Sequence, residues 1–461
     1  MANKLAFKTF PGYGLGDFGF NLVFQFTQVY LSYFFAEIMG LSGTQAAMIF
    51  LLARIWDAIN DPLMGVFISR TKTRWGTFRP FILWSILPLA GSLLLLHYHP
   101  HLEGNGAFIY ALVAYILFGM AFTMGNVPYG ALTARLTNDY HERGRLTSWR
   151  MTLGIIGGMV AVLIARPLTD ALTAQTGDEA LAWFITAGIL GGIMAIALLL
   201  TFLLVKEDPN APVKAESEES IIAGWKTLIG NKPFWVLTVS FVFNFIALTM
   251  LTGAIPFFFE FYLHDKGLEP IITGMVFLVA ALSVPLWSLI GKRTSKRSAY
   301  IAGVLTYIAG LLGVYFLAHQ GVATLYSSFI LVGLGAGASA YAGWSMLPDT
   351  VEYGDWKNGT RNEGAVYGVY GFFFKLGIGL GLAAMNLGLQ WQGYVQQAAS
   401  QTESAQQGIR AIACIGPVIA LAISLLIIWF YRLGPSSHAF IVSELGKRKG
   451  ANSIIDEIGQ E

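Results

Sequence analysis

Charged residues are scarce in this chain of 461 residues. Asp, Glu, Lys and Arg together make up 12% of it, whereas 55% of the residues are hydrophobic. Soluble globular proteins usually contain about 25% charged residues. The shortage therefore excludes an ordinary soluble domain and indicates a protein that lies in a lipid bilayer.

Cysteine is nearly absent, because Cys414 is the one cysteine in the sequence. An internal disulfide and a cysteine-based metal cluster are thereby excluded. Three histidines fall in HYHPH, residues 97–101, which we interpret as an exposed loop and not as a metal site. The formal charge of +2 gives no sign of nucleic-acid binding. No nucleophile lies beside a base in an apolar segment, so we expect no enzymatic activity.

Long hydrophobic runs, in contrast, recur along the whole chain. A bilayer core of roughly 30 Å needs about 20 apolar residues per crossing helix. Twelve such helices are predicted, at residues 11–37, 43–69, 80–98, 107–131, 146–171, 182–205, 233–263, 268–290, 298–319, 323–347, 363–393 and 409–433. We predict an all-α integral membrane protein, with a six-helix bundle at 1–205, a linker at 206–231, a second bundle at 232–434 and a tail at 435–461.

Basic residues gather in alternate loops of this predicted arrangement. One set of loops is basic, as in RTKTRWGTFR at 70–79 and KRTSKR at 292–297, whereas the opposite loops have few Lys or Arg residues. Basic loops stay in the cytoplasm during membrane insertion. Both termini and the linker are therefore predicted to be cytoplasmic.

The second predicted span contains charges that are costly in a membrane. Arg54, Asp57, Asn60 and Asp61 fall within ARIWDAINDP, residues 53–62. Asp57 and Asp61 are four residues apart, so they share one face of a helix. Two neighbouring carboxylates repel each other unless a proton or a cation lies between them. The pattern predicts a coupling-ion site, and a structural ion pair with Arg54 is the alternative interpretation.

Two more basic residues lie inside predicted spans. Lys375, in the eleventh span, is a natural counter-charge for Asp57 or Asp61 when no cation is bound. Arg150, in the fifth span, suits contact with a substrate or extension toward lipid headgroups equally well. GLGDFG, residues 14–19, is not interpreted as a nucleotide-binding loop, because no strand precedes it. Its glycines are interpreted as positions of close helix packing or as part of a cavity-lining surface.

Three motifs are specific as a set: GYGLGD at 12–17, the acidic motif of the second span with the basic loop RTKTRWGTFRPF at 70–81, and DTVEYGDWKNGTRNEG at 349–364. With them the chain resembles the family of the bacterial melibiose carrier, the glycoside–pentoside–hexuronide:cation symporters of the major facilitator superfamily. The resemblance implies two pseudo-symmetric six-helix bundles in a bacterial inner membrane. It also implies symport of a sugar with sodium or a proton by alternating access.

The resemblance also implies roles for individual residues. Asp57, Asn60, Asp61 and Thr123 match the cation-site positions of the family. Several oxygen ligands favour sodium over a proton as the coupling ion. No further cofactor or metal is expected.

The sugar-binding positions depart from the melibiose carrier. Its two sugar-binding carboxylates are replaced by Asn21 and Asn126, which shifts the expected substrate away from melibiose. Arg150, Lys375 and Trp344 complete the predicted sugar site, with Tyr30 and Trp149 as further aromatic candidates. The basic residues Arg54, Arg150 and Lys375 outnumber the acidic residues Asp57 and Asp61 by one. A hexuronide or a sulfonated sugar is therefore favoured slightly over a neutral pentoside or glucoside.

Charged residues at the predicted cytoplasmic rim suit gate ion pairs that break during transport: Arg70, Arg74, Asp349, Glu352 and Arg361. Solvated loop charges are the alternative interpretation. The competing functions are a proton-coupled carrier of an anionic sugar, a lysolipid carrier on the same scaffold, and a membrane sensor that does not transport. The protein is expected to act as a monomer, with the sugar, the cation and the bilayer as its partners.

Overall fold

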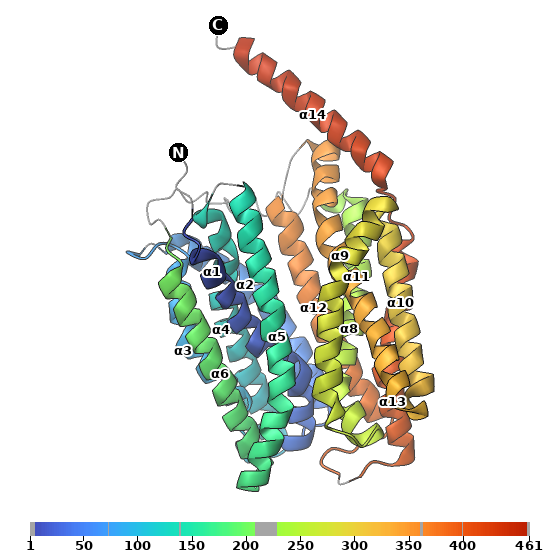
Figure 1. The fold of residues 1–461 in the computed structure, drawn as a ribbon. Helices are drawn as coiled ribbons and strands as arrows, with labels where there is room; N and C mark the ends of the chain where they lie inside the picture. Colours follow the sequence, from blue (N-terminus) through green and yellow to red (C-terminus); the bar gives the residue numbers. More distant parts are fainter. Residues whose placement is uncertain are drawn as a thin grey trace. The chain divides into compact units, whose positions relative to one another are not determined.

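Helices account for nearly all of the regular structure. A computed structural model describes residues 5–71, 73–137, 140–207, 228–359, 363–398 and 400–458, and these contain no strand (Figure 1). The α-helices are α1 (Thr9–Tyr33), α2 (Gly43–Arg70), α3 (Arg79–Leu96), α4 (Asn105–Leu136), α5 (Tyr140–Thr176), α6 (Glu179–Leu204), α8 (Lys232–Phe257), α9 (Leu268–Arg293), α10 (Lys296–Leu317), α11 (Val322–Asn358), α12 (Glu363–Trp391), α13 (Glu403–Ile428) and α14 (Pro435–Ile458). Short segments of other helix types are η1 (Phe34–Ile38), η2 (Phe258–Tyr262) and η3 (Ala318–Gln320).

Each predicted span coincides with one helix, from α1 to α6 and from α8 to α13. Ten of them, α3 to α6 and α8 to α13, are long and apolar enough to cross a membrane. The other two are α1, which is rich in glycine, and α2, which carries Arg54, Asp57 and Asp61. The predicted all-helical membrane fold is confirmed. The predicted tail contains α14, and residues 208–227 of the predicted linker lie outside the described residues.

The helices group into two compact units by close packing. Unit 1 contains α1 to α6 together with Thr249–Phe277 and Gly379–Ala413. Unit 2 contains residues 228–248, Leu278–Ile378 and the chain from Cys414 onward. Each of α8, α9, α12 and α13 is thus shared between the two units. The division into bundles at 1–205 and 232–434 stays a prediction.

In unit 1, α1 packs against α5 and α6, and α2 packs against α4. Glycines make the approach of α1 close, because a Cβ atom added at Gly16 would lie 2.4 Å from the Tyr129 ring. One added at Gly157 would lie 2.3 Å from the backbone oxygen of Phe18. The Tyr13 hydroxyl donates to the backbone oxygen of Tyr129 at 2.9 Å. The expected packing role of the GLGDFG glycines is confirmed.

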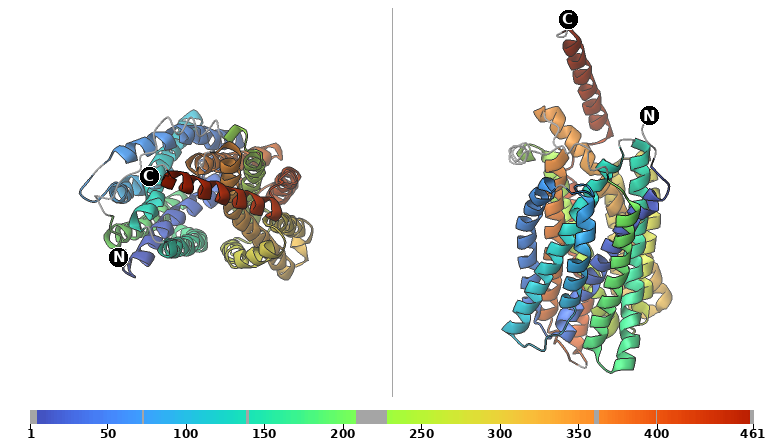
Figure 2. Two further views of the ribbon diagram at one scale, coloured as in Figure 1. Left: turned by 90° about the horizontal axis from the view of Figure 1, so that it is seen from above. Right: turned by 90° about the vertical axis from the view of Figure 1, so that its left-hand side faces the viewer.

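In unit 2, α10 packs along α11, and α11 also contacts α14. Gly335 permits the first contact, since a Cβ atom there would lie 2.5 Å from the backbone nitrogen of Tyr307. Arg448 of α14 donates to the backbone oxygen of Trp356 at 2.9 Å. The further views in Figure 2 show the long helices end-on and from the side.

One end of unit 1 is formed by helix ends from distant parts of the sequence. Here α1 ends in the π-helical η1 and α8 in the π-helical η2. The helix α2 begins at the same end, where the Ser42 hydroxyl accepts from the backbone nitrogen of Gln45 and caps the helix. We call this the distal end: residues 34–41, 258–265 and 392–402.

Candidate functional site

The predicted cation-site residues come together on two adjacent helices of unit 1. Asp57, Asn60 and Asp61 lie on α2, and Thr123 lies on α4. Asp57 and Asn60 are buried, with 5% and 6% exposure, and Thr123 is buried as well. The Thr123 hydroxyl donates to Oδ1 of Asp61 at 3.1 Å. Thr123, from the fourth predicted span, thus contacts the acidic motif, and its role in a cation site stays a prediction.

Arg54 holds the first of the two carboxylates. Its Nη1 lies 2.9 Å from Oδ2 of Asp57, and its Nη2 donates to the Tyr115 hydroxyl at 2.9 Å. The guanidinium also lies 5.5 Å from the centre of the Tyr115 ring. A structural Arg–Asp pair thus exists, as the alternative interpretation proposed. It includes Asp57, and the hydroxyl of Thr123 contacts Asp61.

Glycines make room for this charged cluster. A Cβ atom added at Gly119 of α4 would lie 3.2 Å from Oδ1 of Asp57. One added at Gly379 of α12 would lie 2.2 Å from Cγ of Arg54. The aliphatic part of Arg54 therefore occupies space that a larger residue at 379 would fill. These two glycines leave room for the Arg54 side chain and the Asp57 carboxylate.

Asn60 has a buried amide nitrogen without a hydrogen-bond partner among the described residues. Buried polar side-chain atoms usually have a partner, so an exception in a charged cluster indicates a place where a ligand or water binds. The amide oxygen of the same side chain suits a cation. The cluster offers carboxylate, amide and hydroxyl oxygens, the ligand types that a hard cation prefers.

A second buried ion pair lies between α1 and α5. Nε of Arg150 lies 3.3 Å from Oδ1 of Asp17, and the guanidinium is 5.1 Å from the centre of the Tyr129 ring. Asp17 is 7% exposed. Nδ2 of Asn21 donates to the backbone oxygen of Asp17 at 3.0 Å. Arg150 therefore lies next to the predicted sugar residue Asn21, and extension toward lipid headgroups does not describe it.

Asp17 is the residue that the sequence reasoning missed. It belongs to the motif GLGDFG, of which only the glycines were interpreted from the sequence. Asp17 adds one negative charge beside Arg150 that the sequence prediction did not include. Within unit 1, the two basic residues Arg54 and Arg150 face three carboxylates: Asp17, Asp57 and Asp61. The predicted excess of positive charge also counted Lys375, which belongs to unit 2, so the slight preference for an anionic sugar stays a prediction.

The remaining predicted sugar residues are less tightly grouped. Asn126 is half-buried on α4, one helical turn from Thr123. Trp344 and Lys375 belong to unit 2, where the Trp344 side chain is exposed and its ring lies 6.3 Å from that of Tyr370. Lys375 is half-buried on α12. Their contribution to a sugar site stays a prediction.

Tyr30, Trp149 and His97 each pack against other residues of unit 1. Tyr30 is fully buried and its hydroxyl donates to the backbone oxygen of Val162 at 3.3 Å, so it is not available to stack on a sugar. Trp149 packs edge-on against Phe7 at 6.5 Å. His97 is also fully buried, with its ring stacked on Phe26 at 4.5 Å, so the expectation of an exposed loop is wrong for this histidine. Apolar packing of the ring explains the difference.

The predicted gate residues fall into two groups. Asp349 is 2.7 Å from Nζ of Lys296, and Glu352 is 2.5 Å from Nε2 of His438 on α14, all within unit 2. Arg74 is exposed, with its guanidinium 4.7 Å from the centre of the Trp75 ring. Arg361 and the side chain of Arg70 lie outside the described residues. Pairing between these two groups stays a prediction.

Comparison with known proteins bears on the whole chain. The family model described as MFS/sugar transport protein matches residues 12–435. The uncharacterized symporter YnaJ of Bacillus subtilis is 31% identical, over 96% of both chains. The isoprimeverose transporter of Lactiplantibacillus pentosus is 30% identical, over 96% of this chain and 92% of its own length.

Among solved structures, similarity extends to a bacterial homologue of the human lysosomal transporter Spinster. Its TM-score is 0.70, at 13% identity, and the match covers 93% of this chain and 98% of that one. At this level of identity the likeness concerns the fold alone. Together with the family model, this likeness indicates the fold of the major facilitator superfamily.

Proposed function

The chain belongs to the MFS/sugar transport family, and from that premise we propose that it is a cation-coupled sugar symporter. The observation that carries this proposal is the cluster on α2 and α4, in which the carboxylates of Asp57 and Asp61 lie near Arg54 and the Thr123 hydroxyl donates to Asp61. Two neighbouring carboxylates repel each other unless a proton or a cation lies between them. Binding of a cation there therefore lowers the repulsion between the two carboxylates.

Sodium fits this cluster better than a proton. A proton needs one acceptor atom, whereas a hard metal cation is held by several oxygens. Asp61 and Thr123 supply two that are already 3.1 Å apart, and Asn60 supplies an amide oxygen one residue away from Asp61. Asp57 contributes its second oxygen beside Gly119 while Arg54 retains the first.

The sugar binds, in this proposal, beside the ion pair of Asp17 and Arg150. Asn21 and Asn126 offer donors and acceptors for hydroxyl groups. Since Asp17 already balances the charge of Arg150 at 3.3 Å, a neutral glycoside or pentoside suits this part of the site better than an anionic sugar. A relative named for isoprimeverose transport at 30% identity supports a glycoside as the class of substrate.

The protein lies in a membrane, as its family and its ten strongly apolar helices indicate. We place it in the bacterial inner membrane with both termini in the cytoplasm, because the basic loops lie on the side of the termini. The distal end then faces away from the cytoplasm.

Gradient-driven uptake into liposomes tests the proposal. Purified protein is expected to accumulate a labelled glycoside only when sodium, or else a proton gradient, is directed inward. Asp57→Cys removes one carboxylate of the cluster and should abolish accumulation, whereas Glu103→Gln changes an exposed carboxylate outside it and should not. Accumulation without any cation gradient, or full activity of Asp57→Cys, would refute the cation site.

A further inference from the structure

The distal end of unit 1 contains the same backbone device twice. After α1, Met39 bonds back to Phe34 at 3.0 Å and Leu41 to Phe35 at 2.8 Å. After α8, Leu263 bonds back to Phe258 at 3.0 Å and Asp265 to Phe259 at 2.9 Å. Gly40 and His264, which occupy equivalent places, both have positive φ, of 65° and 54°. We call residues 34–41 and 258–265 the first and the second π-turn.

π-Helical turns are rare and frequently lie at functional sites. One such turn at a helix end is a detail of that helix, but two with the same hydrogen bonds at equivalent spans are a repeated feature. The residues just before them meet, because the rings of Tyr33 and Phe257 lie 5.5 Å apart. The two turns therefore lie side by side.

Each π-turn carries one glutamate held by the other half of the sequence. In the first turn, Oε1 of Glu37 accepts a hydrogen bond from the Tyr394 hydroxyl and another from the backbone nitrogen of Gln397 at 3.2 Å. The amide of Gln397 in turn donates to the backbone oxygen of Ile38 at 3.2 Å. Tyr394 and Gln397 belong to the segment between α12 and α13.

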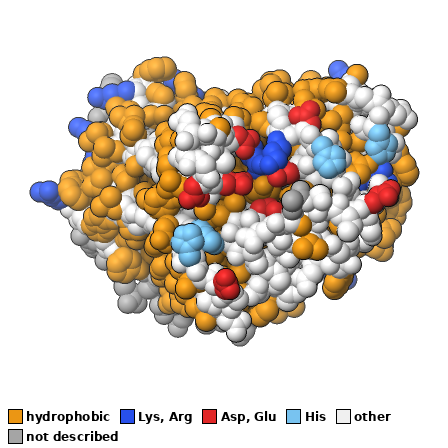
Figure 3. All heavy atoms as spheres, turned by 90° about the horizontal axis from the view of Figure 1, so that it is seen from below, with side chains coloured by type: hydrophobic (Ala, Val, Ile, Leu, Met, Phe, Trp, Pro, Cys, Tyr) orange, Lys and Arg blue, Asp and Glu red, His pale blue; other side chains and the backbone are white. Residues whose placement is uncertain are grey.

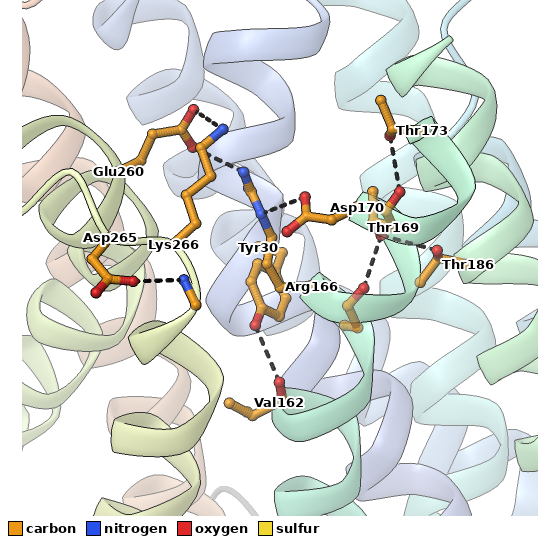
Figure 4. Close-up of polar contacts among 12 residues, drawn as sticks. Tyr30, Val162, Arg166, Thr169, Asp170, Thr173, Thr186, Glu260, Asp265 and Lys266 are labelled. Carbon is orange, nitrogen blue, oxygen red and sulfur yellow. Dashed lines mark hydrogen bonds and ion pairs between the residues drawn. The ribbon is translucent and has the colours of Figure 1, made fainter. Parts of the chain in front are cut away.

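In the second π-turn, the glutamate belongs to the second half of the sequence and its partner to the first half. Oε2 of Glu260 accepts from Nη2 of Arg166 on α5 at 3.0 Å (Figure 4). The Arg166 side chain is 2% exposed, and its Nε lies 3.2 Å from Asp170. Lys266 reaches the other oxygen of Glu260 at 2.5 Å and is 44% exposed. A buried arginine from the first half of the chain thus binds a carboxylate from the second half.

Solvent is close to both contacts. Lys266 and Asp170 are each about half exposed, although Arg166 beneath them is buried. The face seen from below in Figure 3 has acidic and basic side chains gathered near its centre. Water can therefore reach the charged groups as soon as the contacts separate, which lowers the cost of opening compared with a fully enclosed ion pair.

We propose that the two π-turns form a crossed latch, which holds the distal end closed and opens once in each transport cycle. The crossed latch comprises Glu37 with Tyr394 and Gln397, and Glu260 with Arg166. It rests on the proposed function, because alternating access requires that one end of the carrier opens while the other closes. Each contact joins the two halves of the sequence, so both must break together when the distal end opens.

Accessibility of a buried cysteine tests the crossed latch without any transport measurement. Ser32 is 1% exposed beneath the first π-turn, so Ser32→Cys in a Cys414→Ser background supplies a small probe. Its rate of labelling by a membrane-impermeant maleimide is measured on intact cells. Glu37→Gln and Glu260→Gln are each expected to raise this rate roughly tenfold, because a neutral amide oxygen accepts hydrogen bonds more weakly than a charged carboxylate.

Matched variants separate a latch from a general loss of structure. Glu103→Gln changes an exposed carboxylate in the segment between α3 and α4 and should leave the labelling rate unchanged. Tyr394→Phe removes a donor from Glu37 while every charge stays, and should raise the rate even if Glu260→Gln fails to fold. Monodisperse gel filtration of each variant establishes folding.

Two results would overturn the crossed latch. Unchanged labelling in folded Glu37→Gln and Tyr394→Phe would show that the first contact does not hold the end closed. The second result is a labelling rate that rises in folded variants of one π-turn and stays unchanged in folded variants of the other. That result would show that the two π-turns do not act as a pair. Faster labelling with no sugar uptake by the unmodified protein would instead refute the proposed function and leave the latch intact.

Discussion

The central cluster and the crossed latch both place an arginine beside carboxylates, but they are assembled from different parts of the chain. In the central cluster, Arg54, Asp57, Asp61 and Thr123 all come from α2 and α4. In the crossed latch, Arg166 meets Glu260 from a helix end far along the sequence. A site on two neighbouring helices keeps its geometry when other helices move. A contact between the sequence halves has to break.

This difference in origin predicts a difference in phenotype. Changes in the central cluster should alter cation coupling and leave access to the distal end unchanged. Changes in the crossed latch should alter access and leave the cation requirement unchanged. Measurement of both properties on the same variants therefore tests whether the two regions have separate roles.

Asp61→Asn should have the largest effect on this comparison. This change removes the carboxylate that accepts from Thr123 and keeps the pair of Arg54 and Asp57. Sodium-driven uptake into liposomes should fall about 100-fold, as loss of roughly 3 kcal/mol of charged interaction implies. Labelling of Ser32→Cys should stay within error of the unmodified rate. A change in labelling as large as that in uptake would break the separation between the two regions.

A smaller effect is expected for Asp17→Asn, which releases Arg150 from its partner at 3.3 Å. Uptake of a neutral glycoside should fall by about tenfold, because one charged contact that orients Arg150 is lost. At the same time, a hexuronide should become a better inhibitor of uptake, since the guanidinium can now pair with its carboxylate. The measurement is the ratio of the two inhibition constants.

Asp17→Glu is the control for the role of the carboxylate at position 17. It keeps the charge, so neutral-sugar preference should largely return. If neither variant changes the ratio of inhibition constants, Arg150 does not select between neutral and anionic sugars.

Much of the fold could be predicted from the sequence because membrane helices have a strong local signal. A long apolar run predicts a span by itself, and each of the twelve predicted spans coincides with a helix, although α1 and α2 are less apolar than the other ten. The acidic motif of α2 was equally readable, since Asp57 and Asp61 lie on one face by spacing alone. Thr123 came from family resemblance, because spacing within α2 says nothing about α4.

The features that were missed depend on contacts between distant residues. Asp17 looks like part of a glycine-rich packing motif until Arg150 is found 3.3 Å away. The π-turns have no sequence signature beyond paired phenylalanines, and their glutamates resemble ordinary helix-end charges. His97 appears to lie in a polar loop, yet its ring is covered by Phe26. Such contacts follow from tertiary packing, which hydropathy and local spacing do not encode.

The smallest effect, and the finest test of the central cluster, is expected for Thr123→Ala. The hydroxyl donates to Asp61 in the structure and offers its oxygen to a bound cation in our proposal. Loss of one neutral ligand should weaken sodium binding by about 1 kcal/mol. The sodium concentration for half-maximal uptake should therefore rise roughly three- to tenfold. The maximal rate should stay nearly the same, because both carboxylates remain. Thr123→Ser keeps the hydroxyl and should restore the sodium dependence of uptake. An equal loss of sodium affinity in both variants would mean that α2 requires the methyl group of Thr123 and not its oxygen.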